Sequence, residues 1–324
     1  MAGVVVTPGM KQITVLMAVR DTPPGMLRPA VESIRRQTLR GFEFLILDDG
    51  SERPETCAEL ERQAAADSRI RLERGPPRGL TAALNRGLAL AAGALIARQD
   101  ADDWSEPERL ARQTAFLDAH PHIALCGTNA WTHRQDGRSL WATRLPESAA
   151  AIREALCKGN PFVHGSTLFR AGIARDLGGY RAEFRSAQDY DFFWRMSDAG
   201  GAVNLAEPLY HYRYGAAAVS AGRAAEQARA HRAAQLLAAA RRSGGVENVA
   251  RALDQAGREI AAAGPHATAL KQIDHRLLAG DFRAAGWAYA EVLRAHPASG
   301  LAWGKLLRWA VFAAVPPARE WCFR

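Results

Sequence analysis

Three carboxylates stand within four residues, Asp100, Asp102 and Asp103, shortly after the short apolar run 94–97. Such a run predicts a buried strand, so the acids are expected at its carboxyl end. Neighbouring negative charges repel one another unless a cation lies among them, and carboxylate oxygens suit a hard ion such as Mg²⁺ or Mn²⁺. The pattern therefore predicts a divalent metal site. The alternative is a solvated acidic turn in which Asp103 or Ser105 caps the following helix.

A second pair of acids follows another predicted strand. The apolar run 42–47 leads directly into Asp48 and Asp49. Residues 13–19 form an earlier apolar run, and residues 26–37 between the two place apolar side chains at helical spacing, so the unit is β-α-β. Ligands of open α/β sheets bind beyond the carboxyl ends of the strands. Both acidic clusters are therefore expected at one edge of the sheet.

Strand and helix patterns alternate through the rest of the first half of the chain. We expect helices over 54–66, 79–92 and 107–119, and a strand over 69–73. This alternation favours a doubly wound, mostly parallel sheet. Beyond it we expect strands over 123–132, 140–143 and 209–214, and helices over 149–158 and 188–199.

Composition excludes several classes of protein. Nearly half of the 324 residues are apolar and the charged fraction is ordinary, which is typical of a globular protein. Residues 20–25 lack the GxGxxG pattern that a dinucleotide-binding enzyme places after its first strand. The four cysteines have no paired spacing, which argues against a zinc site or a disulfide framework. Neither a secretory signal nor a run of eighteen apolar residues is present, so we expect a cytoplasmic protein.

The last hundred residues differ from the rest. Residues 221–324 carry +7 of the net charge of +8, and their composition shifts to alanine and arginine. We therefore predict two domains, 10–220 and a helical, basic extension over 221–324. Residues 277–297 resemble one tetratricopeptide-like helix pair. Tryptophans and basic residues in 301–315 suit a membrane interface, although an ordinary buried helix would fit them equally. No nucleic-acid-binding motif accompanies the positive charge. The helices expected in the extension cover 221–242, 246–263, 268–278, 282–295 and 300–315.

Seven stretches together resemble the family 2 glycosyltransferases, which are inverting enzymes of the GT-A fold. They lie in the order of the family across residues 12–220. The resemblance implies an α/β nucleotide-diphospho-sugar transferase fold, a nucleotide-sugar donor and a divalent cation, Mn²⁺ or Mg²⁺. The matching stretches are 13–19, 32–38, 42–51, 79–87, 99–110, 160–170 and 187–194.

The resemblance also implies roles for the strand-end acids. Asp48 and especially Asp49 would contact the nucleobase, because a carboxylate accepts a hydrogen bond from an imide N–H. Asp102 would be the direct metal ligand, and Asp100 would lie near the ribose or a metal-bound water. The segment that holds Arg78 and Asn85 would flank the nucleotide.

Asp189 aligns with the catalytic base of the family, which is the second residue of a Glu-Asp pair. Here Gln188 replaces the Glu, and we expect the pKa of Asp189 to be lower than that of a paired acid. Asp191 competes for the role of base. Trp194 is expected in the core, with a place in the acceptor cleft as the alternative.

Two further positions are candidates for phosphate or acceptor contacts. His164 lies in the Asn-Pro-x-x-His segment of the family and could touch either group or be purely structural. Arg213 stands in Tyr-Arg-Tyr, where the family commonly has Tyr-Arg-x-His. Because that histidine is missing, Arg213 is the residue left to contact a phosphate.

The sequence thus predicts a metal-dependent, inverting glycosyltransferase that uses a UDP- or dTDP-sugar. By analogy with the family its acceptor would be a glycan or a lipid-linked glycan of a bacterial cell envelope, with the protein in the cytoplasm or peripheral at the inner face of the membrane. The alternative is a catalytically impaired homologue that binds a nucleotide-sugar without turnover, because of Gln188 and the missing histidine.

Overall fold

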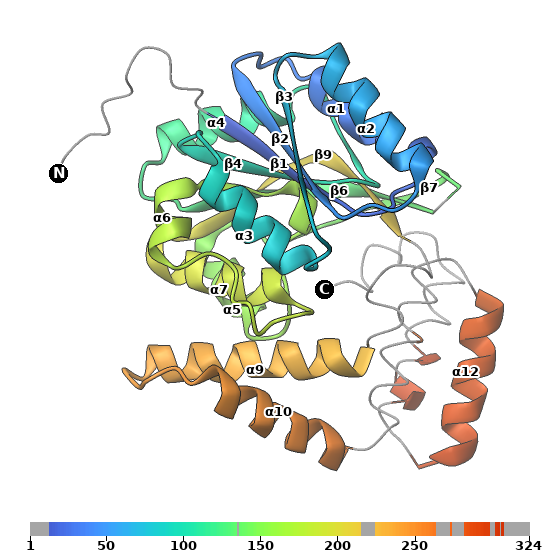
Figure 1. Ribbon diagram of the computed structural model, residues 1–324. Coiled ribbons are helices and arrows are strands. Elements are labelled where there is room, and N and C mark those ends of the chain that lie inside the picture. The colour runs from blue at the N-terminus through green and yellow to red at the C-terminus, as the bar shows by residue number, and fades with distance from the viewer. Residues whose placement is uncertain are drawn as a thin grey trace. The chain divides into compact units, whose positions relative to one another are not determined.

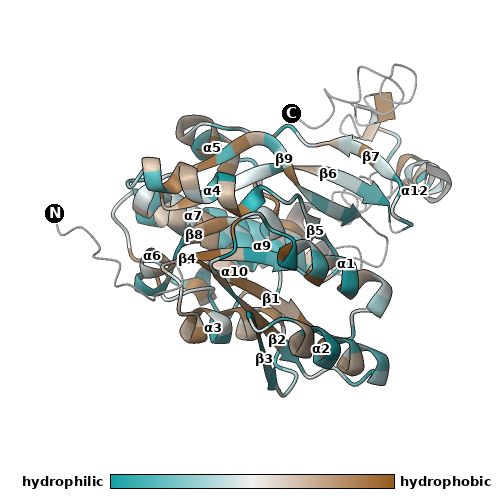
Figure 2. Cartoon of the chain, turned by 90° about the horizontal axis from the view of Figure 1, so that it is seen from above, coloured by the Kyte–Doolittle hydropathy of each residue, from teal (hydrophilic) through white to brown (hydrophobic). Residues whose placement is uncertain are grey.

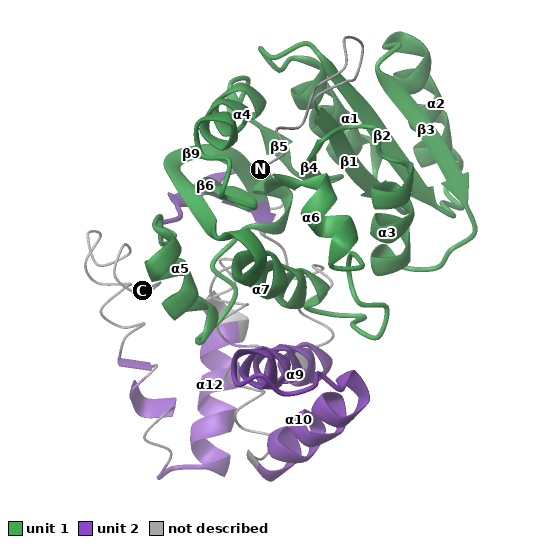
Figure 3. Cartoon of the chain, turned by 90° about the vertical axis from the view of Figure 1, so that its left-hand side faces the viewer, with its two compact units in different colours: residues 1–131, 145–212 green, residues 132–144, 213–324 purple. Residues whose placement is uncertain are grey.

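The computed structural model describes residues 13–134, 136–214, 224–263, 273, 282–298, 302–304 and 306–307 (Figure 1). The chain divides into two compact units, residues 1–131 with 145–212 and residues 132–144 with 213–324 (Figure 3). The predicted helix 268–278 lies almost wholly outside the described residues. Residues 277–281 of the predicted helix pair 277–297 and most of the predicted helix 300–315 also lie outside the described residues.

Four parallel strands form one half of the sheet, in the order β3-β2-β1-β4. Helices α1 Pro24–Arg35 and α2 Pro54–Ala66 cover one side of this half and α3 Leu80–Leu90 covers the other (Figure 1). Because both faces are covered, β1 and β2 are almost entirely buried, as their continuous apolar runs predict. Figure 2 shows the apolar character of β1 in the interior. The strands are β1 Ile13–Val19, β2 Phe42–Asp49, β3 Ile70–Gly75 and β4 Leu95–Asp100.

The other half of the sheet is antiparallel. Strand β8 pairs with β4 in antiparallel fashion and is followed in the sheet by β6, β9 and β5, while β7 pairs with β6. The predicted α/β architecture is confirmed, and its sheet is mixed. These strands are β5 Trp104–Ser105, β6 Leu125–Arg134, β7 Ser139–Ala142, β8 Leu168–Arg170 and β9 Ala202–Tyr214.

The helices of the first unit follow the predicted pattern with few changes. Pro24 opens α1 instead of separating it from β1, because proline is tolerated in the first turn of a helix. The short α6 was not predicted, since six residues are too few for a helical period to appear. The helices are α1 Pro24–Arg35, α2 Pro54–Ala66, α3 Leu80–Leu90, α4 Arg109–Ala119, α5 Ala149–Leu156, α6 Ala171–Asp176 and α7 Gln188–Gly200, with the 3₁₀ turn η1 His164–Ser166.

The described part of the second unit is mainly helical. Helices α9 Ala224–Arg242 and α10 Val249–Ala263 pack against each other and are bridged by an ion pair between Arg232 and Glu259 at 2.5 Å. Helix α12 Phe282–Ala295 buries Tyr289, while its Trp287 is 70% exposed. Among the described residues, the structure contains no helix with both the length and the apolar character needed to cross a membrane.

Candidate active site

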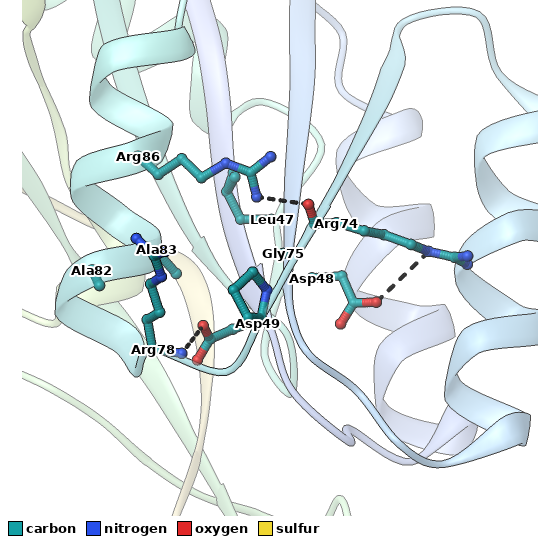
Figure 4. Close-up of a pocket in the computed structure, with 10 residues that line it drawn as sticks. Leu47, Asp48, Asp49, Arg74, Gly75, Arg78, Ala82, Ala83 and Arg86 are labelled. Carbon is teal, nitrogen blue, oxygen red and sulfur yellow. Dashed lines mark hydrogen bonds and ion pairs between the residues drawn. The ribbon is translucent and has the colours of Figure 1, made fainter.

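A pocket of about 360 Å³ lies beside the carboxyl ends of β2 and β3 and the first turn of α3 (Figure 4). Its volume falls in the range of small-molecule sites. The carboxylates of Asp48 and Asp49 lie on its β2 side, and three arginines lie around it: Arg74, Arg78 and Arg86. The pocket therefore combines hydrogen-bond acceptors with a positively charged rim.

Asp49 holds the loop that leads into α3. Its Oδ1 accepts a hydrogen bond from the backbone N–H of Arg78 and its Oδ2 accepts one from Gly79, both at 2.8 Å. A carboxylate is stabilised at this place because it faces the N-terminus of a helix. Both oxygens of Asp49 thus anchor this loop, and its predicted contact with the base stays a prediction.

Asp48 faces the pocket from the end of strand β2. Its Oδ1 accepts from the backbone N–H of Ser51 at 2.9 Å, and its Oδ2 lies 3.8 Å from Arg74 Nε. Both acids lie in the strand itself, where the sequence analysis placed them just beyond it. Gly50 follows with φ +72°, and a Cβ there would lie 2.6 Å from Pro77 Cδ, so the turn after the acids requires glycine.

The arginines of the pocket differ in their partners. Arg74 pairs with Glu61 at 2.8 Å, and Arg86 pairs with Glu73 at 2.9 Å. Arg78 is exposed, and its guanidinium makes no ion pair with any residue that the structure describes. Among these three arginines, Arg78 thus has the guanidinium most available to an anionic ligand.

Asn85 is not among the residues that line the pocket. Its Nδ2 donates to the backbone carbonyl of Tyr180 at 2.7 Å, and its Oδ1 accepts from the backbone N–H of the same residue at 2.8 Å. One turn earlier on α3, Thr81 donates to the carbonyl of Phe184 at 2.9 Å. The amide of Asn85 ties the segment before α7 to α3, and its predicted nucleotide contact stays a prediction.

The acidic loop after β4 contains three carboxylates in three different environments. Asp100 pairs with the buried Arg98 at 2.5 Å and keeps about a quarter of its side chain exposed. Asp102 is exposed. Asp103 is buried, and its Oδ2 accepts from the Tyr210 hydroxyl at 3.0 Å. The loop is therefore neither a uniform cluster of acids nor a plain solvated turn.

Neither predicted cap is used at the start of α4. Glu108 is its N-cap residue, and no side chain caps the helix there. Ser105 lies in β5, where its hydroxyl donates to Gln99 Oε1 at 2.7 Å, and Asp103 is held by Tyr210. The prediction that Asp103 or Ser105 caps the next helix is wrong, because buried polar partners engage both side chains.

The donor set decides which kind of divalent ion the site can hold. Among the described residues there is no group of three or more His, Cys, Asp and Glu side chains placed to hold a metal. An ion bound by protein ligands alone therefore does not fit. An ion such as Mg²⁺ that takes one or two carboxylates and completes its coordination with phosphate oxygens and water does fit the exposed Asp102.

Asp189 lies in the first turn of α7 and is partly exposed. Burial raises its pKa to about 6, and the negative charge of Asp100 acts in the same direction. The backbone N–H groups of residues 189 and 190 and the Asn160 side chain oppose this rise, since all of them donate to the carboxylate. The negative charge that helps to raise the pKa of Asp189 thus belongs to Asp100 on β4. The neighbouring residue, Gln188, is neutral and buried.

Asp191 is 2% exposed and lies between two guanidinium groups. Arg181 lies 2.9 Å from one of its oxygens, and Arg195 lies 2.8 Å from the other. A carboxylate engaged in this way on both oxygens serves a buried ion-pair network. The surroundings of Asp191 therefore contradict its candidacy as the base, and Asp189 is left as the candidate in this helix.

His164 and Trp194 also have structural surroundings. His164 Nε2 lies 3.1 Å from the Tyr180 hydroxyl, and burial together with the charge of Arg98 lowers its pKa to about 3. The imidazole is thus neutral near pH 7 and cannot attract a phosphate by its charge. Trp194 is 3% exposed and meets Tyr190 edge to face, so the acceptor-cleft alternative is wrong and the core expectation holds.

Arg213 lies on β9 and belongs to the second unit. Its predicted phosphate contact stays a prediction. Residues that the sequence analysis missed are Arg98, Asn160 and Tyr210. A charged residue between the apolar run 94–97 and the acidic loop could have pointed to Arg98, and Asn160 opens one of the stretches that carry the family resemblance.

The chain matches the family model named Glycosyl transferase family 2 over residues 14–178. The chain belongs to this family. The prediction that it is a glycosyltransferase is confirmed at the level of the family. EpsE of Bacillus subtilis, which carries the name of a glycosyltransferase, is 35% identical over 195 residues, 58% of this chain and 68% of EpsE. The amylovoran biosynthesis glycosyltransferase AmsE of Erwinia amylovora is 30% identical over 59% of this chain and 72% of AmsE.

Other relatives are much longer. The O-antigen biosynthesis protein RfbC of Myxococcus xanthus is 31% identical over 66% of this chain, and the match spans only 16% of RfbC. Among solved structures, S. aureus TarS 1-349 in complex with UDP-GlcNAc has a TM-score of 0.57 at 18% identity, covering 86% of this chain and 83% of the TarS 1-349 chain. The mannosyltransferase PcManGT of Pyrobaculum calidifontis, in complex with GDP-Man and Mn2+, has a TM-score of 0.57 at 19% identity, covering 96% and 83%. These two likenesses show the fold.

Proposed function

We propose that this protein transfers a sugar from a UDP- or dTDP-sugar to a hydroxyl of a glycan or lipid-linked acceptor, with inversion at the anomeric carbon. The observation that carries the proposal is the pocket at the carboxyl ends of β2 and β3, which is lined by the carboxylate of Asp48 and by the exposed Arg78. The pKa of Asp189, raised to about 6 mainly by burial, suits a general base near neutral pH.

In the proposed reaction Asp189 accepts the proton of the acceptor hydroxyl. The acceptor oxygen forms a bond to the anomeric carbon while the bond from that carbon to the diphosphate oxygen breaks. The leaving nucleoside diphosphate takes the electron pair of that bond. One displacement from the opposite face inverts the anomeric centre, and no covalent sugar-enzyme intermediate is required.

A divalent cation, Mn²⁺ or Mg²⁺, would be held by Asp102, and it would supply charge neutralisation for the leaving diphosphate. Asp100 would lie near the ribose or a water of the ion. Its ion pair with Arg98 compensates its charge from the protein side.

The pocket beside β2 and β3 would take the nucleobase. Asp48 is the acceptor we propose for a base N–H, because Asp49 is committed to the loop before α3. The exposed Arg78 would contact the phosphates. Since guanine also carries N–H donors, a GDP-sugar must be included in any test of the donor.

Names among the relatives support a pathway of polysaccharide assembly in the cell envelope, and we propose such a pathway for this protein. The catalytic domain would be residues 10–220 and the helical extension residues 221–324. Basic helices of the extension would bring the cytoplasmic enzyme to the inner face of the membrane, where lipid-linked acceptors lie. We propose no nucleic-acid partner.

The proposal is tested by incubating the protein with UDP-, dTDP- and GDP-sugars and a panel of glycan acceptors while the released nucleoside diphosphate is measured. We expect release with one class of donor that depends on Mn²⁺ or Mg²⁺ and drops at least about 100-fold in Asp189→Asn, the range typical for loss of a general base. Tight donor binding without any release would favour the catalytically impaired homologue. Full activity in Asp189→Asn would overturn the role of the base.

A further inference from the structure

Asn160 precedes Pro161 in the segment between α5 and η1, and its side chain touches the proposed base. Its Nδ2 donates to Asp189 Oδ2 at 2.7 Å, which is a short bond for an amide donor. Its Oδ1 accepts from the backbone N–H of Phe162 at 3.1 Å. Both ends of the amide are therefore engaged, one by the backbone of its own loop and one by the carboxylate.

The bond to Phe162 determines which way the amide faces. An N–H can only be met by an acceptor, so the amide oxygen must point to Phe162 and the amide nitrogen must point to Asp189. The Asn160 amide is thus fixed by its oxygen to the backbone of its own loop, and its nitrogen holds Oδ2 of Asp189. This contact restricts rotation of the carboxylate, whose helix begins after Ala187 in the left-handed conformation with φ +53°.

We propose that Asn160 is a positioning residue for the base, a role that rests on the proposed function of Asp189. It holds the Asp189 carboxylate in one orientation and favours its ionised form. In triads of nucleophile, base and orienting group, the third group acts on the base in the same manner. Asn160 itself need not touch the substrate.

Several groups around Asp189 determine whether its carboxyl is ionised or protonated. Asp100 on β4 and the low polarity of the surroundings favour the protonated form. The N–H groups of residues 189 and 190 and the amide of Asn160 favour the ionised form. Tyr180, whose own pKa is raised mainly by burial and also by the charge of Asp189, faces it from the segment before α7. Removing the amide donor therefore moves this balance toward the protonated, inactive base.

The sharpest variant is Asn160→Asp, which keeps the shape of the side chain and an oxygen for the Phe162 N–H but replaces the donor by an acceptor. A role limited to shaping the loop would survive this change. A positioning role would not, since two carboxylates would then face each other and the pKa of the pair would rise. Asn160→Ala removes the donor without adding a charge and serves as the second variant.

The experiment measures kcat and KM for donor and acceptor from pH 5 to pH 9. For Asn160→Asp we expect the acid limb of the kcat profile to move up by about one pH unit or more. At a pH well below the new limb, kcat should be about tenfold lower for every pH unit by which the limb has moved, because the ionised fraction of the base falls by that factor. The donor KM should stay within about twofold, since we place Asn160 away from the nucleotide. Asn160→Ala should move the limb in the same direction by a smaller amount.

Asn248→Asp is the matched control. Asn248 is exposed, and its Oδ1 accepts from the backbone N–H of Arg251 at 2.9 Å, a bond that aspartate can keep. If both Asn160 variants retain the wild-type kcat and pH profile, the positioning role is overturned. Loss of activity in Asp189→Asn separates that outcome from failure of the proposed function, because the base itself would then still be required.

Discussion

The Asp189→Asn substitution should stabilise the protein near neutral pH while it removes the proposed base. Asp189 has a pKa of about 6 in the folded protein, raised from an ordinary value of 3.8 mainly by burial. Each unit of pKa corresponds to about 1.4 kcal/mol, so the charged carboxylate costs the folded state up to about 3 kcal/mol above pH 6. A neutral asparagine of the same shape avoids this cost and can still accept from Asn160.

The sign of the pH dependence follows from proton binding. Between pH 3.8 and pH 6 the folded protein holds its proton at Asp189 while the unfolded chain has lost it, so stability falls as the pH rises. Below pH 3.8 both states are protonated and the charge costs nothing. The advantage of Asp189→Asn should therefore be small at pH 4 and grow to on the order of 2–3 kcal/mol at pH 7.

Urea unfolding at pH 4, 5, 6 and 7 measures this difference directly. Asp198→Asn, at an exposed position on the same helix, is the control and should change the free energy of unfolding by no more than about 0.5 kcal/mol. A stability difference for Asp189→Asn that does not vary with pH would refute the reasoning. So would a loss of stability at pH 7, since it would mean that the charge is favoured in the folded state.

Three further substitutions test structural assignments. Asn85→Ala removes two hydrogen bonds to the backbone of Tyr180 and should lower the free energy of unfolding by about 2–3 kcal/mol in urea, with nucleotide affinity little changed; a folded, stable variant that has lost nucleotide binding would contradict this. Asp191→Asn uncouples two arginines and should cost about 3 kcal/mol by thermal or urea unfolding, while the folded fraction keeps the wild-type pH profile. Gly87→Ala places a Cβ 2.2 Å from Leu16 Cδ1 and should lower the free energy of unfolding by about 1–3 kcal/mol. An unchanged unfolding midpoint would contradict this, because it would mean that Leu16 moves aside at no cost.

The parallel half of the fold was predictable because its signals are local. Continuous apolar runs mark β1 and β2, and Pro54–Ala66 was predicted with the bounds that α2 has. The antiparallel half was less accessible, because the orientation of β8 and the pairing of β5 with β9 depend on contacts between distant segments. Periodicity within one segment carries no information about such pairing.

In the site, too, local sequence signals were informative and contacts between distant segments were not. The sequence pattern pointed to the acids at the ends of β2 and β4, but it could not tell which oxygens the protein itself would use. Asp49, Asp103 and Asp191 have the residue type that the chemistry needs, yet the structure engages them with backbone N–H groups, a tyrosine and two arginines. The partners of Asp49 and Asp103 come from remote parts of the chain, and only the folded structure brings them together.

The central claim is that the chain binds a nucleoside diphosphate through the pocket beside β2 and a cation held by Asp102. Calorimetric titration of UDP, dTDP and GDP, with and without Mn²⁺, on wild type, Asp102→Ala and Asp48→Ala, tests it most directly. We predict that one nucleotide binds in the presence of Mn²⁺. Its affinity should lose its dependence on Mn²⁺ in Asp102→Ala and should fall at least about tenfold in Asp48→Ala, as expected when a specific hydrogen bond to a charged group is lost. Binding that is equally strong without the ion, and unchanged in both variants, would contradict the claim.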